Sequence, residues 1–165
     1  LYRGRFGTAG EIGHTIVESE GLLCNCGKRG CLEAYSSGAA ILKRFQQAID
    51  HGKKSSLLSL MDVNSIRTED IFKAAKQGDE LSIDIIDSAI DYLSMAITNL
   101  INILCPQAVI LSGGIGSETE FFVKPLVKKV NSRIYELLRD KVQVIPALLA
   151  ENAPFMGASM LFTAQ

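Results

Sequence analysis

Three of the four cysteines of this chain lie within eight residues, in the stretch CNCGKRGCLE that runs from Cys24 to Glu33. Such a group restricts the local backbone strongly, because its sulfur atoms must either bond to one another or share a metal. A disulfide between Cys24 and Cys26 would close a strained ring and leave Cys31 unpaired. Redox pairs usually have the spacing C-x-x-C beside a helix start, whereas the spacing here is C-x-C-x4-C.

A zinc site fits this spacing better than a disulfide or a redox pair. Zinc in structural sites takes four cysteine or histidine ligands in a tetrahedron, at about 2.0–2.3 Å. Gly27 and Gly30 allow a short backbone to fold three sulfurs around one point. His14, ten residues before the cluster, is the nearest candidate for the fourth ligand. Four protein ligands leave no open position, so the predicted metal is structural, and its predicted ligands are His14, Cys24, Cys26 and Cys31.

The composition is that of an ordinary globular domain. Apolar residues make up 47% of the 165 residues and charged residues 21%, and the net charge is −1, which argues against a nucleic-acid surface. No apolar run reaches the roughly 18 residues that span a bilayer, so we expect no membrane segment. Free clustered cysteines and the lack of a signal peptide favour the cytoplasm. Because the first residue is Leu1 rather than methionine, we expect a piece of a longer chain.

The first part of the chain predicts loops followed by helices. The glycine-rich residues 1–35 are expected to form loops with short strands around Gly13–Glu18. Ser36 or Ser37 can cap a helix that ends before Gly52, and residues 53–66 are expected to connect it to a helix that starts at Thr68. Asp79 can cap a long helix, whose apolar stripe favours a core helix over a coiled-coil seam: Ile83, Ile86, Ile90, Leu93, Ile97, Leu100 and Leu104.

The second part alternates strands and helices. A helix is expected to end at Pro106, and Cys105 before it is predicted to be an inert buried thiol. Strands are predicted over 108–111 and 142–145, with helices over 120–138 and 155–162. This order of elements predicts an α/β layer with parallel strands.

The zinc motif and later segments together resemble one known family. AGEIGH, then CxCGxxGCLE and a serine-rich helix start, resembles the ROK family of bacterial sugar kinases and sugar-responsive repressors. LINILCPQAVILSGGIG and ENAPFMGASML also resemble segments of that family, so the resemblance covers residues 1–165. It implies an actin-like, ribonuclease H-like fold, of which this chain would be the second lobe with an incomplete sheet. The zinc loop would be residues 11–33 and the α/β core residues 36–165, in the C-terminal half of the protein.

The resemblance also implies a sugar site on the zinc loop. Glu11, His14 and Glu33 match family positions that bind the hydroxyl groups of a monosaccharide or amino sugar. Glu11 could instead be a plain surface acid, and Glu33 could cap the following helix. In family kinases the glycines that match Gly113 and Gly114 lie beside the nucleotide, whereas the aspartate base and the phosphate-binding turn come from the first half of the protein.

The resemblance leaves the activity of the whole protein open. One hypothesis is the effector-binding part of a repressor of carbohydrate genes, which would bind DNA only through a missing N-terminal region. The segment ENAPFMGAS slightly favours the repressor hypothesis. The other hypothesis is the C-terminal half of a sugar kinase. Only under this hypothesis would the whole protein use ATP and magnesium. A free-standing zinc ribbon would leave the α/β pattern unexplained. Family members commonly form homo-oligomers, so we expect self-association.

Overall fold

The computed structural model describes residues 2–148, 152, 155–156 and 158–160. The chain divides into two compact units, residues 1–96 and 97–165, and the division falls within the long helix α4 (Glu80–Leu104). Within the described residues, no helix is both long enough and apolar enough to cross a membrane.

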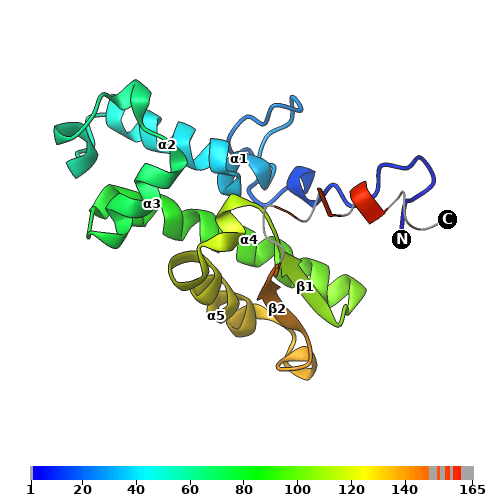
Figure 1. The fold of residues 1–165 in the computed structure, drawn as a ribbon. Coiled ribbons are helices and arrows are strands. Elements are labelled where there is room, and N and C mark those ends of the chain that lie inside the picture. The colour runs from blue at the N-terminus through cyan, green and yellow to red at the C-terminus, as the bar shows by residue number, and fades with distance from the viewer. Residues whose placement is uncertain (1, 149–151, 153–154, 157, 161–165) are drawn as a thin grey trace. The chain divides into compact units, whose positions relative to one another are not determined.

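The first unit contains the predicted helices. The short helix α1 (Glu33–Ser36) is followed directly by α2 (Gly38–Asp50) (Figure 1). The hydroxyl of Ser37 accepts a hydrogen bond from the backbone N–H of Ala40, which confirms the predicted cap. Ile41 and Phe45 are fully buried, so α2 contributes its apolar face to the core of this unit.

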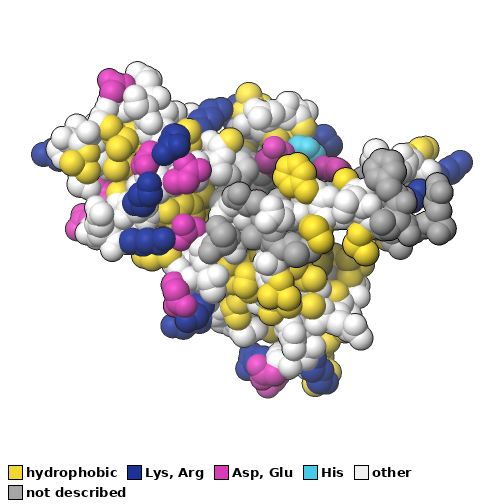
Figure 2. All heavy atoms as spheres, in the orientation of Figure 1, with side chains coloured by type: hydrophobic (Ala, Val, Ile, Leu, Met, Phe, Trp, Pro, Cys, Tyr) yellow, Lys and Arg dark blue, Asp and Glu magenta, His cyan; other side chains and the backbone are white. Residues whose placement is uncertain are grey.

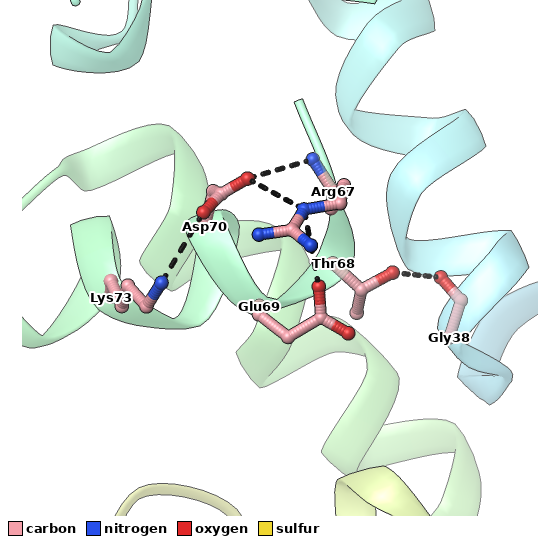
Figure 3. Close-up of polar contacts among 6 residues, drawn as sticks. All are labelled: Gly38, Arg67, Thr68, Glu69, Asp70 and Lys73. Atoms are coloured by element: carbon pink, nitrogen blue, oxygen red, sulfur yellow. Dashed lines mark hydrogen bonds and ion pairs between the residues drawn. The ribbon is translucent and has the colours of Figure 1, made fainter. Parts of the chain in front are cut away.

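Helix α3 (Thr68–Lys76) begins where the sequence predicts and is fixed by a polar network (Figure 3). The carboxylate of Asp70 accepts the backbone N–H of Arg67 at 3.1 Å and lies 3.5 Å from Nζ of Lys73. The backbone N–H of Arg67, together with the positive side chains of Arg67 and Lys73, holds the pKa of Asp70 below its ordinary value. The hydroxyl of Thr68 donates to the carbonyl of Gly38, so the first turns of α2 and α3 are tied together.

Asp79 caps α4, as predicted, and also organises the connection before it. One carboxylate oxygen accepts the N–H of Ser82 at 2.9 Å. The other accepts the hydroxyl of Ser55, together with the hydroxyl and N–H of Ser56. The connection formed by residues 53–66 contains two short 3₁₀ helices, Ser56–Ser59 and Val63–Ser65.

The buried face of α4 differs from the predicted stripe at both ends. The central isoleucines are buried, but Ile83 is 37% exposed and Leu104 is 66% exposed. The buried positions outside the predicted stripe include the small residues Ser82, Ala89 and Ser94, as well as the large residues Leu81 and Ile101. The 3.6-residue period locates the face but does not show that small polar residues also belong to it.

The second unit contains a two-stranded parallel sheet. Strand β1 (Ala108–Leu111) pairs with β2 (Gln143–Pro146), so that Ile110 lies beside Ile145 (Figure 1). Both strands were predicted, the second displaced by one residue. The parallel pairing confirms the α/β prediction for this part of the chain.

The predicted helix over 120–138 is wrong as one continuous element. It consists of a π-helical turn (Thr119–Val123), helix α5 (Lys124–Arg133) and a 3₁₀ turn (Glu136–Leu138). Pro125 lies in the first turn of α5, where its missing N–H costs nothing, so α5 starts there. Ile134 takes an extended conformation and ends the helix.

Three further predictions concern residues 13–18, Cys105 and the last predicted helix. The strands expected around Gly13–Glu18 are wrong: Ile12–His14 is a 3₁₀ turn, and only an isolated bridge follows at Ile16. Cys105 is exposed rather than buried, and it follows α4 directly, with a φ of 44°. Within the predicted helix 155–162, residues 155–156 and 158–160 are helical, whereas Gly157 and residues 161–162, like Pro154 before it, lie outside the described residues.

The sheet of the second unit presents apolar side chains to its surface. Ile110 is 63% exposed and Ile145 is 40% exposed, and hydrophobic side chains gather over this region in Figure 2. Exposed apolar residues that lie together are typical of association surfaces. Self-association of the protein stays a prediction.

We predict that Asp79→Ala lowers the free energy of unfolding at pH 7 by about 1–2 kcal/mol, because α4 loses its cap. Burial opposes ionisation of Asp79, but hydrogen bonds from Ser82 and Ser56 prevail and lower its pKa to about 2. A lowered folded-state pKa contributes stability above the unfolded pKa of about 3.9, and this stability is lost as the pH falls toward 2.

Urea unfolding at several pH values measures this effect. The difference between wild type and Asp79→Ala should shrink between pH 5 and pH 3. Asp62→Ala is the matched control, since exposed Asp62 caps only the short turn Val63–Ser65. A difference that is independent of pH, or equal for the two variants, would contradict the prediction.

Candidate metal centre

The loop that carries the predicted ligands is folded by a few backbone hydrogen bonds. The turn Ile12–His14 leads into a bridge between Ile16 and Cys31. The N–H of Leu32 donates to the carbonyl of Thr15 at 2.9 Å. His14 and Cys31 are therefore held on neighbouring antiparallel segments.

A tight turn presents the other two cysteines. The N–H of Cys24 donates to the carbonyl of Lys28 at 2.8 Å, and the N–H of Gly27 donates back to the carbonyl of Cys24 at 3.0 Å. Gly27 adopts a φ of 84°, which favours glycine. Gly30 has a positive φ as well, and a Cβ atom there would collide with the carbonyl oxygen of Glu18.

The four predicted ligands converge on one point. Their ligand atoms all lie within 4.8 Å of one another. Nδ1 of His14 is 3.8 Å from Sγ of Cys24, and Sγ of Cys26 is 3.6 Å from Sγ of Cys31. A tetrahedron with zinc–sulfur bonds of about 2.3 Å has edges of about 3.8 Å, so these separations suit zinc. They are far longer than a disulfide bond of about 2.05 Å, and all four cysteines are free.

The electrostatics of the thiols also suit a cation. Burial, together with hydrogen bonds from the neighbouring sulfurs, raises the pKa of Cys31 to about 11. The backbone N–H of Lys28 lowers the pKa of Cys26. A divalent cation deprotonates the thiols that bind it, and it would supply the positive charge that three close thiolates need. The cluster of His14 and three cysteines is therefore consistent with a zinc site.

Glu33 lies directly beside this cluster. It is the first residue of α1, and its Oε2 atom is 3.5 Å from Nδ1 of His14. Both side chains are accessible, with exposed fractions of 44% for Glu33 and 40% for His14. Glu11 is exposed and begins the turn that ends at His14. The backbone N–H of His14 donates to the carbonyl of Glu11. Two of the three predicted sugar ligands, Glu11 and His14, thus belong to one turn, and Glu33 lies at the start of α1.

A cavity of about 190 Å³ opens between the zinc loop and α2. Glu33 is part of its wall, but neither Glu11 nor His14 is among the described residues that line it. Its lining is mixed, with Leu22 and Leu23 from the loop and Lys43 and Gln47 from α2. This cavity is therefore bordered by Glu33 but not by the imidazole of His14.

Gly113 and Gly114 lie in an exposed turn after β1. Gly113 has a φ of 88°, and Gly114 starts a short 3₁₀ helix, Gly114–Ser117. The turn belongs to the second unit. Its contact with a nucleotide stays a prediction.

Residues that brace the zinc loop were missed in the sequence. The hydroxyl of Tyr35 accepts the backbone N–H of Leu22 at 2.6 Å, and Tyr92 donates to Glu18 at 3.1 Å. Neither tyrosine belongs to a motif that marks it. Both lie on helices, far in sequence from the loop residues that they bind, so only the fold brings them together.

Comparison with known proteins gives a consistent result over the whole chain. The model of the ROK family matches residues 1–165. A glucokinase of Thermotoga maritima is 35% identical over 162 residues, which are 98% of this chain and 51% of that protein. A xylose repressor of Bacillus subtilis is 34% identical over 161 residues, again 98% of this chain but 38% of the repressor. The chain thus spans about half the length of the glucokinase.

Solved structures agree with these matches. A ROK family glucokinase from Streptomyces griseus, in complex with glucose and AMPPNP, superposes with a TM-score of 0.83 at 34% identity, covering 98% of this chain and 53% of the glucokinase. A ROK family transcriptional regulator homologous to the E. coli MLC protein gives a TM-score of 0.75 at 29% identity, covering 88% and 36%. The fold, the His–Cys cluster and the match over its full length show that this chain belongs to the ROK family.

Proposed function

We propose that this chain is the sugar-binding part of a ROK protein, in which a structural zinc ion orders the loop that carries Glu11, His14 and Glu33. The observation that carries the proposal is the position of Glu33: its carboxylate lies 3.5 Å from His14, beside four converging zinc ligands. The glucokinase of Streptomyces griseus, which has the same fold over 98% of this chain, was solved with glucose.

The chemistry of these residues suits a monosaccharide. A carboxylate accepts two hydrogen bonds from neighbouring hydroxyl groups, and charged acceptors form the stronger bonds. The imidazole of His14, when one nitrogen binds zinc, has its other nitrogen free to exchange a hydrogen bond with a hydroxyl. A loop that is already ordered loses less entropy when the sugar binds.

Two activities of the whole protein are compatible with this site. The similarity to glucokinases supports an ATP-dependent sugar kinase, in which Gly113 and Gly114 would approach the nucleotide. The similarity to xylose repressors and to the E. coli regulator NagC supports a repressor that responds to a sugar. The identities of 35% and 34% are too similar to separate them. A repressor would bind DNA through residues outside this chain.

We predict one zinc ion per chain, measured by elemental mass spectrometry of the purified protein. Cys31→Ser should lose the metal and unfold at a markedly lower temperature, because structural zinc contributes directly to the free energy of folding. Cys105→Ser is the matched control, since this exposed cysteine lies outside the cluster, and it should keep full zinc content. Folded protein without metal, or a disulfide within the cluster, would refute the site.

We predict that Glu33→Gln weakens sugar binding by the whole protein about tenfold or more, because a charged acceptor becomes a neutral one. Isothermal calorimetry with glucose, xylose and N-acetylglucosamine measures the affinity. Glu136→Gln, an exposed residue of the second unit, is the control and should leave the affinity unchanged. Equal affinities for Glu33→Gln and wild type, at full zinc content, would exclude Glu33 from the sugar site.

We predict that the 165 residues alone do not phosphorylate sugars. Phosphoryl transfer needs a base for the hydroxyl proton and a phosphate cradle with its metal, which the family resemblance assigns to the other half of the protein. The zinc has four protein ligands and therefore no position for phosphate or water. A coupled assay of ADP release tests this. Turnover that scales with the concentration of this chain, and that disappears when one of its acids is mutated, would overturn the prediction.

A further inference from the structure

We propose that Tyr35 and Tyr92 are positioning residues that hold the zinc loop against α4 by contacts that do not involve the metal. The proposal rests on the proposed function only for its effect on sugar affinity; its effect on zinc release is independent of any sugar. All residues concerned lie within the first unit.

Tyr35 is the more buried of the two tyrosines. Its side chain is 5% exposed, and its hydroxyl oxygen accepts the backbone N–H of Leu22 at 2.6 Å. The loop approaches so closely here that a Cβ atom on Gly21 would collide with the Tyr35 hydroxyl. Gly21 does not have a positive φ, so the close side chains of Tyr35 and Glu18, rather than the backbone conformation, favour glycine at this position.

Tyr92 supports Tyr35 from α4. The centroids of the two rings are 4.1 Å apart and the rings are tilted by 35°, so the two side chains are in direct contact. The hydroxyl of Tyr92 donates to Oε2 of Glu18, on the same loop, at 3.1 Å. Burial and the neighbouring Glu18 carboxylate raise the pKa of Tyr92, so the hydroxyl keeps the proton that it donates.

Two further residues, Arg44 and Ser36, fix α1, the helix that begins with Glu33. Arg44 donates to the carbonyl of Tyr35 at 3.0 Å and to the hydroxyl of Ser88 at 2.7 Å. Its guanidinium also lies 5.8 Å from the centre of the Tyr35 ring. The hydroxyl of Ser36 donates to the carbonyl of Ala89 at 2.9 Å, and this contact is buried. Helices α1, α2 and α4 thus form a rigid base for the tyrosines.

The loop is consequently attached at two places. The metal cluster joins His14 to the three cysteines, and the tyrosines hold residues 18–22, which connect these ligands. Removing a tyrosine hydroxyl leaves all four ligands in place but frees the connecting segment. The cluster should then open more often, zinc should leave faster, and Glu33 should be aimed less accurately at the sugar.

The test uses the whole protein loaded with zinc and measures the rate of zinc transfer to a chromophoric chelator. Tyr35→Phe keeps the ring but loses the acceptor for Leu22, and we expect release about three- to tenfold faster at an unchanged content of one zinc. The absorption spectrum of the cobalt-substituted protein should be unchanged, because the ligands are the same. Tyr135→Phe, at an exposed tyrosine of the second unit, is the control and should release zinc at the wild-type rate.

Equal release rates in Tyr35→Phe, Tyr135→Phe and wild type would overturn the proposal. If Tyr35→Phe does not fold, Tyr92→Phe, which loses only the bond to Glu18, replaces it with the same expected direction. Glucose, xylose and N-acetylglucosamine affinities are measured on the same variants. Faster release in a protein whose wild type binds none of these sugars would support the positioning role and count against the proposed function.

Discussion

The arrangement of the first 32 residues depends on the meeting of four side chains within 4.8 Å. This segment has little regular structure: a 3₁₀ turn and two isolated bridges. So little regular structure does not by itself fix a loop, because each residue that is ordered costs conformational entropy. A zinc ion bound by these four side chains, as we propose, would join turns that are distant in sequence and restrict them together. The accessible side chain of Glu33, 3.5 Å from His14, would then be held beside the metal cluster.

The two units have different local sources of order. In the first, helix starts are determined by side-chain caps such as Ser37, Asp70 and Asp79, and the last of these also joins α4 to the preceding connection. In the second, order comes from the parallel pairing of β1 and β2 and from the buried face of α5. Each unit is therefore ordered by interactions of its own.

Local chemistry explains how much of this structure the sequence could predict. The spacing of three cysteines, a histidine and two glycines is a strong signal for a metal, and all four ligands converge as predicted. Helix starts at Ser37, Thr68 and Asp79 and both strands followed from caps and apolar runs. The π-helical turn, the break at Ile134 and the exposure of Cys105 could not be predicted, because they depend on packing that leaves no local pattern. The contacts of Tyr35 and Tyr92 were missed for the same reason.

The glycines of the loop differ in how much sequence freedom they leave. At Gly27, open space surrounds the missing side chain, and only the positive φ disfavours other residues. Asparagine, which adopts that conformation at small cost, is an acceptable replacement there during evolutionary drift. At Gly30 a positive φ coincides with the main chain of Glu18, which cannot move aside as a flexible side chain would. Substitutions at Gly27 should therefore be tolerated better than substitutions at Gly30, and a library that randomises both positions would show the added steric cost at Gly30.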